Sequence, residues 1–162
     1  MDYLWSPWRY RYVTKAGGTG ECIFCAKGAA SEDEANLIIH RGERAFVLMN
    51  LYPYTTGHLM IAPYEHIPTL GEASPEVVCE IMLLTRRAER CLAAVLHPQG
   101  FNIGMNLGEC AGAGVAGHIH MHAVPRWSGD CSFMTTVGET RVIPEDLETT
   151  YRRILSAWNG GE

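Results

Sequence analysis

Three histidines alternate with apolar residues in the segment GHIHMHAVP, residues 117–125. Side chains at alternate positions of a β-strand share a face, so His118, His120 and His122 are predicted to lie together, about 6.6 Å apart along the strand. Each buried imidazole needs partners for its ring nitrogens, so three on one face indicate a functional site rather than packing. Three further histidines lack such a pattern and are interpreted as structural: His40, His58 and His97.

Two kinds of chemistry use such a row of imidazoles. The three rings can converge on a catalytic metal ion, or one neutral ring can attack phosphorus and form a covalent intermediate. The loop before the row favours the second reading, because the backbone of a glycine-rich loop can turn its amides towards an anion. The glycines of this loop are Gly108, Gly112, Gly114 and Gly117. We therefore expect a phosphate group held against an imidazole.

Cys22 and Cys25 form a CxxC pair in the segment ECIFC. Such a pair can be a redox couple, half of a zinc site, or a chance spacing. Glycines flank it on both sides, which favours a tight metal-binding knuckle at 22–25 over a redox pair that opens a helix. The chain shows no secretory signal, so its six cysteines are not interpreted as a disulfide framework.

The elements that must position these residues follow from the apolar pattern. Short runs rich in apolar residues predict five strands, at 36–40, 44–50, 58–63, 101–107 and 118–125. Ser74, Pro75 and Glu76 are a helix-start signal, and the helix is expected to run to about Leu96. Its apolar face is predicted to hold Val78, Ile81, Met82, Thr85, Ala88, Leu92 and Val95.

A second, short helix is expected from near Pro144 to near Trp158. Consecutive strands with short connections and one or two helices predict an α+β fold with an antiparallel sheet rather than a doubly wound one.

The composition bounds the class of protein. With 162 residues, 47% of them hydrophobic, the chain is long enough for one domain with a sizeable core. No apolar run approaches the roughly 18 residues of a membrane span, so no membrane contact is expected, and the location is expected to be cytoplasmic. A net charge of −5 argues against binding to a nucleic acid polymer.

Residues 1–20 form an arm in which aromatic and basic residues interleave. Packing of its aromatic rings onto the body or onto a partner subunit is the favoured reading. The alternative is a flap that stacks on bases and contacts phosphates.

HIHMHAV, residues 118–124, is similar to the pattern of the histidine triad (HIT) family of nucleotide hydrolases and transferases. The similarity extends to FVLMNLYPYTTGHLMIAP at 46–63 and to the strand near Asn106, and it covers roughly residues 20–135. The tail HAVPRWSGDCSFM resembles a bacterial branch of diadenosine tetraphosphate phosphorylase-like proteins. The resemblance implies one HIT-like domain over 1–162, an α+β fold with an antiparallel sheet of about five strands, one long helix and one short C-terminal helix.

The resemblance also implies roles for single residues. His120 matches the nucleophile that attacks the α-phosphorus, and His122 matches the residue that orients and contacts the phosphate. Asn50 matches a ribose contact and Asn106 a side chain near the phosphates. The loop is expected to bind the nucleotide through backbone amides at Gly112 and Gly114. Some members have a serine where Gly114 stands, and that hydroxyl is missing here.

In zinc-containing relatives, a CxxC pair, a histidine after the second hairpin and the first histidine of the triad bind the metal. The matching residues are Cys22, Cys25, His66 and His118. Two thiolates and two imidazoles complete a tetrahedral shell and leave no open position. The resemblance therefore implies a structural zinc and no organic cofactor.

The leading hypothesis is a nucleotidyl transferase that acts on dinucleoside polyphosphates through a covalent nucleotidyl-histidine. With inorganic phosphate as acceptor, diadenosine tetraphosphate would give ATP and ADP; with water, the protein would be a hydrolase of dinucleotides or nucleoside phosphoramidates. A catalytic-metal hydrolase and a non-catalytic nucleotide-binding module are the alternatives. Arg126 is either an anchor for a distal phosphate or acceptor, or an exposed charge in a turn. A homodimer is expected from the resemblance and because the arm needs a surface.

Overall fold

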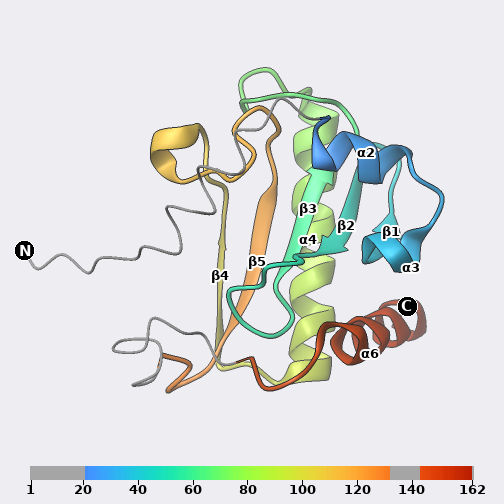
Figure 1. Ribbon diagram of the computed structural model, residues 1–162, viewed down its shortest axis with the longest axis vertical. Coiled ribbons are helices and arrows are strands. Elements are labelled where there is room, and N and C mark those ends of the chain that lie inside the picture. The colour runs from blue at the N-terminus through green and yellow to red at the C-terminus, as the bar shows by residue number, and fades with distance from the viewer. Residues whose placement is uncertain (1–20, 132–142, 162) are drawn as a thin grey trace, which may run out of the picture.

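The computed structural model describes residues 21–131 and 143–161, so the predicted N-terminal arm lies outside the described residues. Within them, five strands form one antiparallel sheet in the order β1-β2-β3-β5-β4 (Figure 1). The strands are β1 (Ile38–Arg41), β2 (Ala45–Met49), β3 (Leu59–Pro63), β4 (Gly100–Gly104) and β5 (Met121–Arg126). The α+β fold with an antiparallel five-stranded sheet is therefore confirmed.

The helices are α2 (Ile23–Ala29), α3 (Asp33–Asn36), α4 (Pro75–Leu96) and α6 (Leu147–Gly160), with one turn of 3₁₀-helix, η1 (Glu109–Ala111). The predicted long helix has the expected bounds: the Ser74 hydroxyl accepts the Val77 N–H at 3.3 Å. The C-terminal helix begins at Leu147, later than predicted, because the Asp146 carboxylate caps it by accepting the Thr149 N–H at 2.9 Å. None of the described helices is both long and apolar enough to span a bilayer.

One face of the sheet packs against α4, with α6 alongside (Figure 1). Alternate residues of β2 and β3 supply this core, and α4 contributes the buried residues Val77, Ile81, Leu84, Thr85, Ala88, Cys91 and Leu92. The prediction that Met82 belongs to this face is wrong, because its side chain is 51% exposed. The prediction rested on the apolar character of Met82 alone, whereas its position on α4 leaves the side chain in solvent.

The other face of the sheet packs against α2. Phe24 is buried there against the alternate residues of β2 and β3, including Phe46 and Met60. Arg41 at the end of β1 holds the far end of α2, because its guanidinium donates to the carbonyls of Gly28 at 2.7 Å and Ala30 at 2.6 Å. These contacts fix α2, and with it the CxxC pair, against the sheet.

The expected knuckle at 22–25 is instead the first turn of α2. Cys22 occupies the N-cap position and Cys25 lies in the helix. The flanking glycines suggested a tight loop, but the buried Phe24 side chain stabilises a helix against the sheet, and tertiary packing overrides this local signal.

Candidate active site

His120 lies directly before β5 and is 4% exposed. Its Nδ1 is 2.9 Å from the backbone oxygen of His118. A carbonyl oxygen only accepts, so Nδ1 carries the proton and Nε2 keeps the lone pair. Burial lowers the pKa of His120, and the bond to His118 raises it by less. The ring is therefore a neutral imidazole with a nucleophilic Nε2.

His122 has the opposite tautomer, and its neighbours set it. The backbone N–H of Tyr54 donates to Nδ1 of His58 at 3.2 Å, so the proton of His58 lies on Nε2. That Nε2 donates to Nδ1 of His122 at 2.9 Å. The proton of neutral His122 is therefore on its own Nε2, where it can serve as a hydrogen-bond donor.

Asn50 completes this chain of hydrogen bonds. Its Oδ1 accepts the Tyr52 N–H at 3.0 Å, which fixes the orientation of the amide, and its Nδ2 lies 3.3 Å from Nδ1 of His58. Asn50 is 9% exposed and supports His58 directly. Its expected contact with ribose stays a prediction.

A cleft of about 1110 Å³ begins beside the triad, with His122 and Asn106 on its wall. His120 does not line it but lies next to it, its ring centroid 4.8 Å from that of His122. Asn106 thus lines the same cleft as His122, and its expected place near the phosphates stays a prediction. Gly112, which has a positive φ of 87°, and Gly114 belong to the loop after η1 and do not line this cleft. Their expected contacts with a nucleotide stay predictions.

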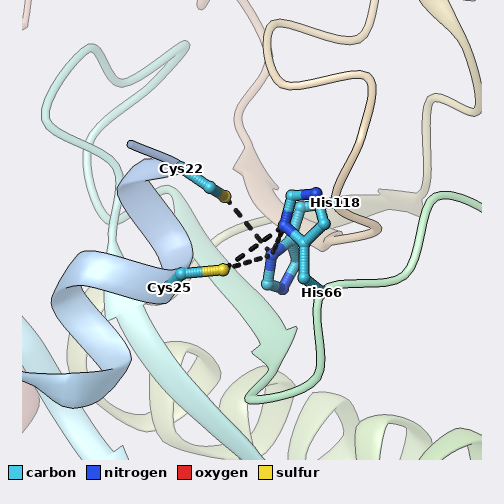
Figure 2. A group of neighbouring side chains, drawn as sticks. All are labelled: Cys22, Cys25, His66 and His118. Atoms are coloured by element: carbon cyan, nitrogen blue, oxygen red, sulfur yellow. Dashed lines mark hydrogen bonds between the residues drawn. The ribbon is translucent and has the colours of Figure 1, made fainter. Parts of the chain in front are cut away.

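Cys22, Cys25, His66 and His118 form a cluster whose ligand atoms all lie within 4.8 Å of one another (Figure 2). Nδ1 of His118 is 3.3 Å from Nδ1 of His66, 3.4 Å from Sγ of Cys22 and 3.6 Å from Sγ of Cys25. Tetrahedral zinc with ordinary bond lengths separates two nitrogens by about 3.3 Å and a nitrogen from a sulfur by about 3.6 Å. The three separations from Nδ1 of His118 therefore match those of a tetrahedral zinc shell.

The protonation of His118 also suits a metal ligand. Its Nε2 lies 2.9 Å from the carbonyl of Pro63, so Nε2 carries the proton and Nδ1 directs its lone pair into the cluster. Gly117 leaves space for the ring of His66, since a Cβ at position 117 would lie 3.3 Å from Nε2 of His66.

The HIT domain family model matches residues 30–129 of the chain. This chain belongs to the histidine triad family. It is 38% identical, over 98% of its length and 85% of the relative's, to a protein named AP-4-A phosphorylase from Mycobacterium tuberculosis. It is 27% identical to the asymmetrical bis(5'-nucleosyl)-tetraphosphatase of Schizosaccharomyces pombe, over 76% of this chain and 64% of that protein.

Solved structures agree with this assignment. A zinc-bound histidine triad family protein from Mycobacterium smegmatis superposes with a TM-score of 0.71 at 32% identity, covering 88% of this chain and 96% of that one. The histidine triad protein ST2152 from Sulfolobus tokodaii, with a TM-score of 0.66 at 20% identity, shares the fold.

The triad of this HIT protein is not one continuous strand, contrary to prediction. Only His122 lies in β5, where it pairs with Met60 of β3. Before that, the Ile119 N–H donates to the carbonyl of Ile67 at 2.8 Å, beyond the end of β3. This change of partner lets His118 turn towards the cluster while His122 meets His58.

The prediction that His58 is structural agrees with its complete burial, but it does not include the hydrogen bond of His58 to the triad. Through this bond His58 holds His122 in its tautomer. The signal in the sequence that points to this contact is the position of His58 in the predicted hairpin. Asn50 and His58 lie at the two ends of the β2–β3 connection, and the Asn50 N–H donates to the His58 carbonyl at 3.0 Å.

Arg126 lines the cleft but is engaged within the protein. Its Nη2 donates to Oδ1 of Asp130 at 2.8 Å, its Nε donates to the other carboxylate oxygen at 2.5 Å, and its Nη1 donates to Oδ1 of Asn102 at 2.5 Å. These bonds hold the turn after β5. Arg126 therefore stabilises this turn, a contact that neither the anchor for a distal phosphate or acceptor nor the exposed charge in a turn includes.

We expect His122 to make the stability of the protein fall at acidic pH. Burial, together with repulsion from His120, lowers the pKa of His122 to about 4. An unfolded histidine has a pKa near 6.5, so the unfolded chain alone binds this proton between those values. The resulting contribution of His122 to the free energy of unfolding is about 3 kcal/mol. It is fully present above about pH 6.5 and is lost as the pH falls towards 4.

Urea unfolding from pH 7 to pH 4.5 should therefore show a shallower pH dependence for His122→Asn than for the wild type. His97→Asn is the matched control, because His97 is exposed and asparagine tolerates its left-handed backbone. Equal pH dependence in the wild type and His122→Asn would contradict the assignment.

Proposed function

We propose that this HIT protein is a nucleotidyl transferase that cleaves dinucleoside polyphosphates, with His120 as the nucleophile. The observation that carries the proposal is the hydrogen bond from Nδ1 of His120 to the His118 carbonyl, which leaves a neutral Nε2 free to attack. The 38% identity to an AP-4-A phosphorylase supports a diadenosine tetraphosphate substrate.

The reaction consists of two displacements at the α-phosphorus. Nε2 of His120 attacks, a P–N bond forms, and the P–O bond to the polyphosphate breaks, so that ATP leaves diadenosine tetraphosphate. The imidazole becomes positively charged, and the His118 carbonyl stabilises it through the Nδ1 proton. An acceptor oxygen then attacks phosphorus, and the P–N electron pair returns to Nε2.

The remaining residues handle negative charge on the transferred phosphoryl group. His122, held as the Nε2–H tautomer by His58, supplies one donor, and we assign further polar contacts to Asn106 and to the amides at Gly112 and Gly114. We assign ribose binding to Asn50. Inorganic phosphate is the proposed acceptor, which makes ADP the second product; water is the alternative acceptor and would give AMP.

A hydrolase with all three triad histidines on one catalytic metal is not supported by this geometry. Nδ1 of His118 faces the cysteine cluster, Nδ1 of His120 donates to a carbonyl, and Nδ1 of His122 accepts from His58. The three rings have three different partners, so they do not converge on one ion.

We expect His120→Ala to lower turnover of diadenosine tetraphosphate by at least about 1000-fold while the fold is kept, because the nucleophile is lost. Intact-protein mass spectrometry of the wild type after an acid quench should show one added adenylyl group, absent in the variant. His97→Asn is the control for a histidine away from the triad. Near-normal turnover by His120→Ala would refute the proposal.

The nucleotide products of the same assay identify the acceptor. ADP and ATP that appear only when phosphate is added indicate phosphorolysis. AMP and ATP indicate that water is the acceptor.

We also propose that the cysteine–histidine cluster holds a structural zinc. The separations of its donors from Nδ1 of His118 match a tetrahedral zinc shell, and a zinc-bound relative shares 32% identity. A cytoplasmic location, which we propose for this protein, keeps both thiols reduced and available as ligands. Zinc would supply a fixed link between α2, the loop at His66 and the segment at His118, while the chemistry belongs to His120.

Protein purified without chelator should contain about one zinc per chain by elemental analysis. Cys22→Ser should lose most of it and have a lower free energy of unfolding, because a ligand of the metal is removed. Cys110→Ser, which changes an exposed thiol of η1 outside the cluster, should keep both values. Wild-type protein without zinc would overturn the proposal.

We further propose a homodimer formed through the exposed side of α4 and the neighbouring edge strand β4. Met82, Leu83 and Ile103 are 51%, 49% and 42% exposed and line one shallow apolar hollow. Analytical ultracentrifugation should find two chains per particle for the wild type and one for Met82→Glu, with Arg90→Ala unchanged as the control on the same helix. A monomeric wild type would exclude the dimer.

A further inference from the structure

Tyr54 lies in the β2–β3 connection with its side chain half-buried. Its ring centroid is 4.5 Å from that of His58 and 5.9 Å from that of His122, and its plane is inclined by 28° to the plane of His122. Tyr54 and His122 both line the cleft, whereas the fully buried His58 does not. The tyrosine ring therefore packs over the His58–His122 pair and separates His58 from the cleft.

The turn that carries Tyr54 is fixed on two sides. The Thr55 hydroxyl donates to the carbonyl of Pro125 in β5 at 2.8 Å. Gly57 has a φ of 78°, and a Cβ at this position would overlap the side chain of Leu96 in α4. The turn is therefore held against α4 and against the strand that carries His122, which sets the place of the Tyr54 ring relative to the triad.

The hydrogen bonds of the covered pair run in one direction. Nδ1 of His58 faces two donors, the Tyr54 N–H at 3.2 Å and Nδ2 of Asn50 at 3.3 Å, so this nitrogen stays unprotonated. The proton on Nε2 of His58 is donated to Nδ1 of His122 at 2.9 Å. A further proton on Nδ1 of His122 would place two donors against each other. The pair is therefore intact only with a neutral His122, and only while no water replaces either partner.

Few titratable groups face His122 within the described residues. His58 and Tyr54 reach it from the β2–β3 connection, and His120 reaches it from the segment before β5, with ring centroids 4.8 Å apart. Its partners on the neighbouring strands carry no charge: Met60 of β3 and Gly104 of β4. No described acid therefore balances a positive charge on His122, so exclusion of water is what keeps this ring neutral.

We propose that Tyr54 is a positioning residue of the triad, whose ring covers the His58–His122 pair on the cleft side and keeps water from replacing either hydrogen-bond partner. This inference rests on the proposed function, in which His122 donates to the phosphoryl group while His120 becomes positively charged. A neutral His122 can donate without repelling that charge, whereas a protonated His122 would oppose it. Tyr54 thus acts on the reaction through His122.

NMR of protein labelled with 15N in its histidine rings tests the cover without turnover. In the wild type, His122 should show one tautomer at pH 7, protonated on Nε2, and should not titrate above about pH 5, in line with its pKa of about 4. Tyr54→Leu should populate both tautomers and raise the titration of His122 above about pH 5, because water reaches the pair. Tyr54→Phe, which keeps the ring, should match the wild type.

Tyr52→Leu is the matched control, because Tyr52 is 64% exposed in the same connection and does not line the cleft. Its His122 signals should equal those of the wild type. An unchanged His122 spectrum in Tyr54→Leu would overturn the proposal. If Tyr54→Leu does not fold, Thr55→Val takes its place: loss of the bond to Pro125 should shift the His122 signals in the same direction, and unchanged signals would refute the cover.

Kinetics separate positioning from contact with the substrate. Tyr54→Leu should lower kcat for diadenosine tetraphosphate roughly tenfold and change KM less than about threefold, because the donor is misplaced while substrate binding is kept. A higher KM with unchanged kcat would assign Tyr54 to substrate binding and contradict the positioning role. If the wild type cleaves no dinucleotide, the proposed function fails, whereas the NMR result still decides whether Tyr54 covers the pair.

Discussion

The hydrogen bond between Nδ1 of His120 and the backbone oxygen of His118 is the constraint on which the site depends. It selects the tautomer of His120, the proposed nucleophile, and its acceptor belongs to a residue that is itself fixed at two further points. Nε2 of His118 donates to the Pro63 carbonyl at the end of β3, and Nδ1 faces the two thiols and His66. His118 therefore joins the sheet, the cysteine–histidine cluster and the ring of His120, so a shift of the sheet or the cluster would move the carbonyl that orients His120.

Helix α2 reinforces this connection from the other side. Its Phe24 lies between the two cysteines in sequence, and its ring centroid lies 5.2 Å from that of His118 and 4.7 Å from that of His120. Arg41 holds the carboxyl end of the helix through backbone carbonyls. The helix and its N-cap thus supply two thiols of the cluster and an apolar wall behind His120. That wall excludes water from the ring and contributes to its lowered pKa.

The residues of the candidate site could be predicted from the sequence more fully than the contacts that support them. Alternation of histidines identifies the triad, and the start signal at Ser74 identifies α4, because both are local patterns. The helix at Cys22 could not be predicted in this way, since burial of Phe24 against the sheet decides it. His58 could not be assigned either, because a single histidine gives no periodicity and its partner His122 is 64 residues away in the chain.

Three identical side chains acquire three different roles through the groups that bind their nitrogens. His118 and His120 donate to carbonyls through different nitrogens, so the first leaves its lone pair on Nδ1 and the second on Nε2. His122 accepts from a neutral imidazole and keeps a proton on Nε2. Backbone carbonyls do not titrate, so the tautomers of His118 and His120 are set by the path of the chain. That of His122 depends on His58, which the Tyr54 amide fixes in turn. The proposed metal ligand, nucleophile and proton donor can therefore lie side by side with no carboxylate hydrogen-bonded to any of the three rings within the described residues.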